Sequence, residues 1–119
     1  MTTSKITLYG IKNCDTVKKA QKWLDAAGIE FNFHDFRKDG LTETQVSEWL
    51  KTIPLEKLVN KRSTTWKQLP DTTKDSLSIH SAPALCAKFE TLIKRPVLEY
   101  ADGVDIGFSD KQYQAIFQK

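Results

Sequence analysis

The chain has few cysteines and lacks long apolar runs and the apolar core of a signal peptide. Its 119 residues contain two cysteines, Cys14 and Cys86, which are too few for a disulfide scaffold and are typical of a reducing compartment. No apolar stretch approaches the roughly 20 residues of a membrane span. Because the first residues, MTTSKITLYG, also lack a signal sequence, we expect a cytoplasmic protein that does not contact a membrane.

Patterns for metal, nucleotide and nucleic-acid binding are missing as well. Neither His34 nor His80 has a cysteine or carboxylate at metal-ligand spacing, so we expect no metal site and no bound cofactor. No glycine-rich phosphate loop is present. The net charge is only +3 and the basic residues are scattered, which argues against direct nucleic-acid binding. The basic residues fit a small anion or an acidic peptide at least as well.

What the sequence does contain is a regular alternation of apolar patterns, and this predicts an α/β fold in a single domain, residues 1–119. A strand, a helix and a second strand form a right-handed βαβ unit. A helical insertion at about residues 41–94 follows, and a β-hairpin and a last helix close the chain. Together these elements predict a four-stranded mixed sheet. The strands are expected at 6–9, 29–36, 97–100 and 104–108, and the outer helices at 15–27 and from Ser109.

Local signals set the boundaries expected inside and beside the insertion. The segment RKDGL, residues 37–41, is expected to turn the chain, and Thr42 with Gln45 forms a capping box for the next helix. Thr64 or Thr65 is expected to cap a short helix around Trp66. The segment DTTKDS, residues 71–76, is expected to be a polar loop. Residues 81–93 are expected to form one helix.

Cys14 lies between the first strand and the first helix, at the first turn of that helix. Backbone N–H groups and the positive end of the helix dipole favour an anion there, so the thiolate is favoured over the thiol. The alternative is that Cys14 is a small buried apolar residue. Cys86 lies beside Leu85 on an apolar helix face, where packing is favoured over chemistry.

Three runs carry a resemblance to a known family: LYGIKNCDTVKKAQKWL, LVNKRSTTWKQL and RPVLEY. They resemble the ArsC/Spx family, and within it the YffB-type members. The resemblance implies a thioredoxin-like fold with a helical insertion. It implies activities that range from glutathione-dependent arsenate reduction to regulation of RNA polymerase. It also implies a nucleophilic thiolate at Cys14 and an arginine, Arg95, before a cis proline, Pro96.

The chain departs from the family pattern at several positions. Arsenate reductases resemble CGTSR from the cysteine onward, and Lys18 occupies the position of the arginine in that run. Asn60 occupies the position of the arginine in their helical insertion, with Arg62 two residues later. Phe108 lies near the position of the arginine in their hairpin. The absence of arginine at these positions argues against arsenate reduction, because an oxyanion needs bidentate cationic partners. Val17 occupies the second cysteine position of the CxxC found in redox-sensing Spx proteins, so no internal disulfide can form beside Cys14.

With one usable thiol, the mechanism that we expect is monothiol exchange: a glutathione-dependent reductase acting through Cys14. Glutathione, with its two carboxylates, is the expected cosubstrate, and glutaredoxin or thioredoxin are further candidate partners. The alternatives are an arsenate reductase and an Spx-like regulator that binds RNA polymerase without catalysis. For the lysines and arginines among the candidate residues, the alternative is a solvated surface charge with no role in binding. The candidate binding residues are Lys12, Asn13, Thr16, Lys18, Arg62, Arg95 and Pro96.

Overall fold

The computed structural model describes residues 6–12, 14–100 and 103–118. The chain forms two compact units, each described by itself. The first comprises Met1–Lys38 and Arg95–Lys119, and the second comprises Asp39–Lys94. The second unit corresponds to the segment expected as a helical insertion. No helix in the described ranges is long and apolar enough to cross a membrane.

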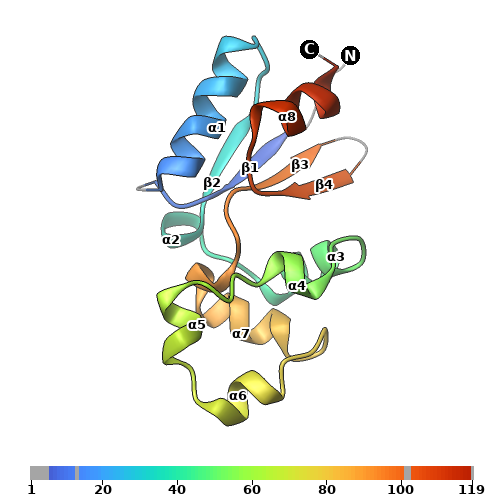
Figure 1. The fold of residues 1–119 in the computed structure, drawn as a ribbon. Helices are drawn as coiled ribbons and strands as arrows, with labels where there is room; N and C mark the ends of the chain where they lie inside the picture. Colours follow the sequence, from blue (N-terminus) through green and yellow to red (C-terminus); the bar gives the residue numbers. More distant parts are fainter. Residues whose placement is uncertain (1–5, 13, 101–102, 119) are drawn as a thin grey trace. The chain divides into compact units, whose positions relative to one another are not determined.

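The first unit is built on a four-stranded sheet in the order β2-β1-β3-β4 (Figure 1). Strand β1 pairs in parallel with β2 and antiparallel with β3, and β3 pairs antiparallel with β4. The mixed sheet and the thioredoxin-like fold predicted from the sequence are therefore confirmed. The strands are β1 (Thr7–Gly10), β2 (Asn32–Asp35), β3 (Val97–Tyr100) and β4 (Gly103–Ile106).

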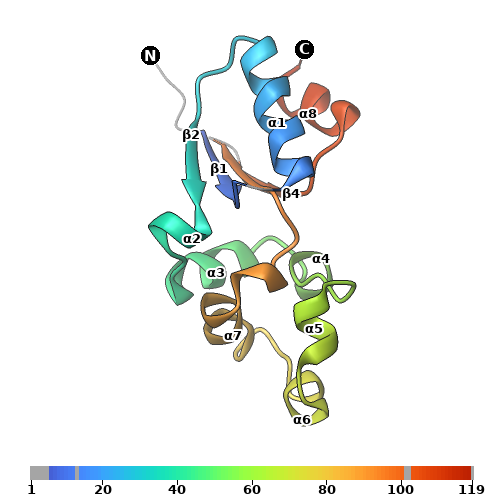
Figure 2. The same cartoon turned by 90° about the vertical axis from the view of Figure 1, so that its left-hand side faces the viewer.

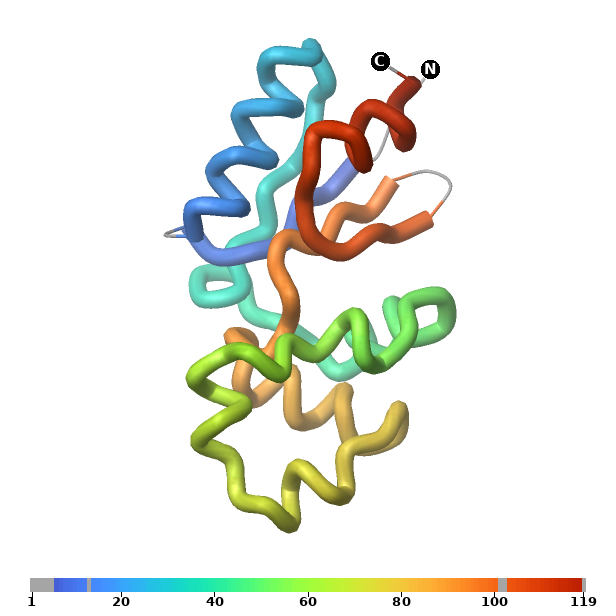
Figure 3. The backbone as a smooth tube through the Cα atoms, viewed as in Figure 1, coloured from blue at the N-terminus to red at the C-terminus, as the bar shows by residue number. Residues whose placement is uncertain are grey.

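Two helices, α1 (Asp15–Ala26) and α8 (Asp110–Phe117), cover one face of this sheet (Figures 2 and 3). The helical spacing of Val17, Ala20 and Leu24 directs one stripe of α1 toward the strands, where these side chains are fully buried. Helix α8 contributes the buried ring of Tyr113. The first-unit core consists of Ile6, Leu8, Val17, Ala20, Leu24, Leu98 and Tyr113.

The second unit is helical, and its elements follow one another with short connections. Thr42 and Gln45 form the expected capping box at the start of α3. Its buried residues include Trp49, Leu58 and Cys86. The chain enters it from α2 (Phe36–Asp39), and its helices are α3 (Glu43–Leu50), α4 (Leu55–Leu58), α5 (Thr64–Gln68), α6 (Asp71–Asp75), α7 (Ala82–Lys88) and the 3₁₀ turn η1 (Glu90–Leu92).

Several local boundaries differ from the sequence expectations. The expected polar loop at 71–76 contains helix α6, because the Pro70 carbonyl accepts hydrogen bonds from the N–H groups of Thr73 and Lys74. Ser63, rather than either threonine, caps α5 by accepting a hydrogen bond from the Trp66 N–H. The single helix expected over 81–93 ends at Lys88 and continues as a 3₁₀ turn.

The strand boundaries and the 37–41 turn differ in the same way. Strand β2 is shorter than residues 29–36, since the Asp35 carboxylate accepts a hydrogen bond from the Arg37 N–H and starts helix α2 where a turn was expected. Strand β4 ends at Ile106, before the positive φ of 81° at Gly107.

Candidate active site

At one end of the sheet, the chain segments that carry the candidate residues lie close together. Strand β1 ends at Gly10 and β3 begins at Val97, and the antiparallel register places Tyr9 opposite Val97. The Gly107 N–H donates a 2.8 Å hydrogen bond to the Pro96 carbonyl. The loop to Cys14, the segment before β3 and the segment after β4 therefore meet at this end of the sheet.

Cys14 is the N-cap residue of α1, with extended backbone angles of φ −107° and ψ 123°. Its carbonyl accepts the 2.9 Å hydrogen bond of the Lys18 N–H, and its own N–H donates to the Ile11 carbonyl at 3.3 Å. The side chain is half-buried and packs against the first-unit core. Its sulfur makes no capping hydrogen bond with the described first turn. The interaction that favours a negative charge on this sulfur is therefore the one with the positive end of the α1 dipole.

The position of this cysteine depends on a close contact between β1 and α1. A Cβ atom added at Gly10 would lie 2.6 Å from Cγ2 of Val17, which is fully buried. Only glycine allows the first turn of α1 to approach the strand so closely. The first strand was expected to end at residue 9, whereas β1 includes Gly10, and no positioning role was expected for this glycine. The buried β-branched residue one turn into the helix was the available signal.

Arg95 and Pro96 directly precede β3, and the peptide bond between them is cis, as the family resemblance implied. Pro96 is buried and Arg95 is half-buried. The Arg95 Nη1 atom is buried and has no hydrogen-bond partner among the described residues. A guanidinium nitrogen in that state can donate to an anionic ligand, because its own desolvation is not yet compensated.

The other predicted residues are distributed differently. Lys12 and Lys18 are exposed on either side of Cys14, and Thr16 is half-buried in the first turn of α1. Asn13 lies outside the described residues. Arg62 is exposed in the second unit, so its role at the Cys14 site stays a prediction.

Cys86 is fully buried in the second unit, as the sequence indicated for a packing residue. Burial raises the pKa of its thiol to about 12. A thiol with that pKa is almost entirely protonated near neutral pH and does not act as a nucleophile. Of the two cysteines in the chain, Cys14 is the one exposed to reagents.

This difference predicts selective alkylation. At pH 8 in the native protein, iodoacetamide should modify Cys14 and leave Cys86 unmodified, because the Cys86 thiolate fraction is only about 10⁻⁴. In denaturant both cysteines should react. Peptide mapping by mass spectrometry checks the result, and equal native labelling of both residues would contradict the burial of Cys86.

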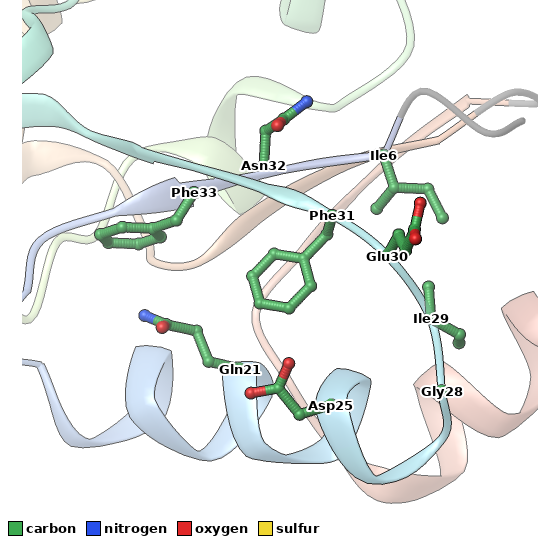
Figure 4. Close-up of a pocket in the computed structure, with 9 residues that line it drawn as sticks. All are labelled: Ile6, Gln21, Asp25, Gly28, Ile29, Glu30, Phe31, Asn32 and Phe33. Atoms are coloured by element: carbon green, nitrogen blue, oxygen red, sulfur yellow. The ribbon is translucent and has the colours of Figure 1, made fainter.

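A groove of about 730 Å³ lies elsewhere on the first unit. Figure 4 shows Phe31 and Phe33 directed toward Gln21 and Asp25 of α1. The groove adjoins the start of β2 and the second half of α1, the opposite end of the sheet from Cys14. Its lining contains no cysteine, lysine or arginine, so it is separate from the thiol chemistry. The full lining is Ile6, Gln21, Asp25, Gly28, Ile29, Glu30, Phe31, Asn32 and Phe33.

Two curated proteins are similar to this chain over nearly its full length. A Haemophilus influenzae protein is 48% identical over 112 residues, which cover 94% of this chain and 98% of that protein. A global transcriptional regulator Spx from Lactococcus lactis is 25% identical over 116 residues, which cover 96% of this chain and 87% of the regulator.

Solved structures agree with these sequence relatives. A YffB protein superimposes with a TM-score of 0.89 at 34% identity, covering 93% of this chain and 97% of that one. An arsenate reductase (ArsC) related protein from Brucella melitensis gives a TM-score of 0.74 at 42% identity, covering 97% and 96% of the two chains. The sequence pattern of the ArsC family matches residues 9–116. A match of this extent, together with these relatives, establishes that the chain belongs to the ArsC family, as the motifs around Cys14 indicated.

Proposed function

We propose that the protein is a glutathione-dependent monothiol reductase that acts by thiol–disulfide exchange through Cys14. The observation that carries this proposal is the placement of the two cysteines. Cys14 is half-buried at the N-terminus of α1, whereas Cys86 is fully buried in the other unit. A resolving thiol therefore comes from outside the chain, and a small soluble thiol such as glutathione fits that requirement.

The proposed reaction has two exchange steps. In the first, the Cys14 thiolate attacks the glutathionyl sulfur of a mixed disulfide; a Cys14–glutathione disulfide forms, the substrate S–S bond breaks, and the departing thiolate takes a proton from water. In the second, the thiolate of another glutathione molecule attacks the same sulfur. Oxidised glutathione forms and the Cys14 thiolate is released. The substrate disulfide is the oxidant, and glutathione is the reductant.

Arg95 is the residue that we assign to glutathione binding at this end of the sheet. Arg95 directly precedes β3, in the segment that meets the Cys14 loop at one end of the sheet. Its Nη1 atom has no partner among the described residues, and its peptide bond to Pro96 is cis. A planar guanidinium matches a carboxylate bidentately. Lys12, Thr16 and Lys18 are near Cys14 in sequence and supply further polar contacts in this proposal.

The proposal predicts turnover in a defined assay. Purified protein should reduce the mixed disulfide of glutathione and hydroxyethanethiol with reduced glutathione as the electron donor, followed through glutathione reductase and NADPH. Absence of turnover above the uncatalysed exchange would contradict the proposed function.

Replacing Arg95 tests its role within that assay. Arg95→Ala should raise the KM for glutathione about tenfold, since a charge-assisted hydrogen bond contributes roughly 1.5–3 kcal/mol and part of this is screened at a half-buried site. Arg95→Lys should recover only part of the loss, because an ammonium cannot bind a carboxylate bidentately. Lys111→Ala on the exposed side of α8 is the matched control. An unchanged KM in Arg95→Ala would remove this residue from the glutathione site.

Arsenate reduction is a second candidate, favoured by the similarity to the arsenate reductase (ArsC) related protein of Brucella melitensis. Against it, Lys18 and Phe108 stand at positions where the resemblance implied arginine. Release of arsenite from arsenate with glutathione and glutaredoxin, lost in Cys14→Ser, would establish that activity.

A regulatory role without catalysis is the third candidate, favoured by the similarity to the Spx regulator of Lactococcus lactis. Such a protein would bind RNA polymerase, and the exposed Lys57, Lys61 and Lys67 of the second unit would offer a surface. Equal capture of polymerase by the native chain and by Cys14→Ser, without thiol turnover, would support it.

A further inference from the structure

A groove of about 320 Å³ lies on the first unit along the flank of α1. Lys19, Lys22 and Trp23 line it from α1. Phe108 lines it from the segment before α8, and Asp110 is the first residue of that helix. All five residues belong to the same compact unit as Cys14. The volume is at the lower end of the range found for small-molecule sites.

The apolar part of this α1–α8 groove is fixed by ring packing. The Trp23 ring stacks on Phe117 with centroids 5.9 Å apart and meets the edge of Tyr113 at 5.5 Å. Phe108 also makes an edge contact with Tyr113, at 4.7 Å. Tyr113 itself is fully buried. Because a buried residue holds both lining rings, their aromatic surface is present before any ligand binds.

The polar part of the α1–α8 groove is mainly cationic. Lys19 and Lys22 are exposed, and within residues 6–12, 14–100 and 103–118 neither forms an ion pair. Asp110 is also exposed, as the first residue of α8, where its carboxylate is stabilised by the helix dipole. The lining of the groove is mainly apolar, so the two lysines line it with their aliphatic stems and hold their ammonium groups in solvent at its rim. An apolar floor with cations at the rim suits a ligand that combines a planar apolar group with a carboxylate.

The α1–α8 groove is within reach of a substrate held at Cys14. Lys19 and Lys22 follow Cys14 by five and eight positions, so the helical rise places them about 7.5 Å and 12 Å further along the axis. Cys14, Trp23 and Phe108 all pack against the same first-unit core. A chain of two to four residues, at about 3.3 Å per residue, spans that distance.

We propose that the α1–α8 groove binds the departing half of the disulfide substrate and selects one that carries an aromatic group and a carboxylate. The inference rests on the proposed thiol exchange and names the class of substrate. The thiol held in the groove is the one that leaves when Cys14 bonds to the glutathionyl sulfur. Lys19, Lys22, Trp23 and Phe108 would then determine specificity, and Cys14 alone would perform the chemistry.

Four symmetrical disulfides of N-acetylated peptides, long enough to reach from Cys14 to the groove, test the selection: Cys-Gly-Gly-Phe (aromatic, anionic), its C-terminal amide (aromatic, uncharged), Cys-Gly-Gly-Leu (aliphatic, anionic) and its C-terminal amide (aliphatic, uncharged). The rate of adduct formation at Cys14 is measured by intact mass for each. Replacing both groove lysines, Lys19→Gln with Lys22→Gln, should slow the two anionic probes about fivefold and leave the uncharged probes within about twofold. Trp23→Leu should slow both aromatic probes. For each probe, the rate of the variant is divided by the rate of the native protein, so differences in intrinsic reactivity between the disulfides cancel.

The matched control replaces two exposed lysines outside the groove, Lys38→Gln with Lys111→Gln, and changes net charge equally. Equal slowing of all four probes by the groove variants, or the same pattern in the control, would overturn the proposal. A failure of the proposed function is separate, because it appears as native protein that forms no adduct with oxidised glutathione. Probe selectivity remains measurable in that case.

Discussion

Replacing Cys14 by serine should lower glutathione-dependent turnover by at least about 10³-fold, because a serine hydroxyl is not ionised and cannot form the mixed disulfide. The fold should be retained, since Cys14 is half-buried and its side chain makes no capping hydrogen bond with the described first turn. The assay with the glutathione–hydroxyethanethiol disulfide measures the loss.

Cys86→Ala is the control for this substitution. Cys86 is fully buried in the second unit, so its truncation should lower the free energy of unfolding by about 1–2 kcal/mol through the cavity that it leaves. Turnover of the folded variant should stay within about twofold of the native value. Substantial turnover in Cys14→Ser, or loss of turnover in folded Cys86→Ala, would show that Cys14 is not the nucleophile.

Adding a methyl group at Gly10 should have a large effect on stability. The new Cβ would lie 2.6 Å from Cγ2 of buried Val17, so either α1 or the end of β1 must shift. Overpacking of this kind costs about 1–3 kcal/mol. Because α1 carries Cys14 at its N-terminus, Gly10→Ala should also slow alkylation of Cys14. Urea denaturation and alkylation rates measure the two effects.

A double-mutant cycle identifies the contact that causes the loss. Val17→Ala removes the two methyl groups nearest to the added Cβ, so Gly10→Ala should cost much less in that background than in the native protein. Gly103→Ala is a second control, because its Cβ would lie 3.7 Å from the Tyr100 hydroxyl oxygen, an ordinary contact distance. Similar stability losses at Gly10 and Gly103, with no coupling to Val17, would contradict the packing explanation.

The part of the site that was predictable from sequence is the part encoded locally. Apolar alternation and helical spacing on the two sides of Cys14 identify the junction of β1 and α1, and both signals lie within about twenty residues. The hairpin position was also recognisable, because turn signals are short-range. These signals predicted the sheet that brings the segments together. The site role of Arg95 and the cis bond to Pro96 were implied by the family resemblance and not by a local pattern.

Features that composition and apolar periodicity do not record were not predictable in this way. Residues 71–76 have the polar composition of a loop, and their helix is started by the backbone carbonyl of Pro70. The clash that requires glycine at position 10 involves a side chain seven residues later. The α1–α8 groove joins residues from two ends of the chain, and no spacing rule relates Lys22 to Phe108.

The central claim is that Cys14 is a nucleophile resolved by an external thiol, and intact-mass analysis after incubation with oxidised glutathione tests it most directly. The native chain and Cys86→Ser should each gain one glutathionyl group, peptide mapping should place it on Cys14, and reduced glutathione should remove it. Cys14→Ser should gain none. An adduct on Cys86, or no adduct on the native protein, would contradict the account.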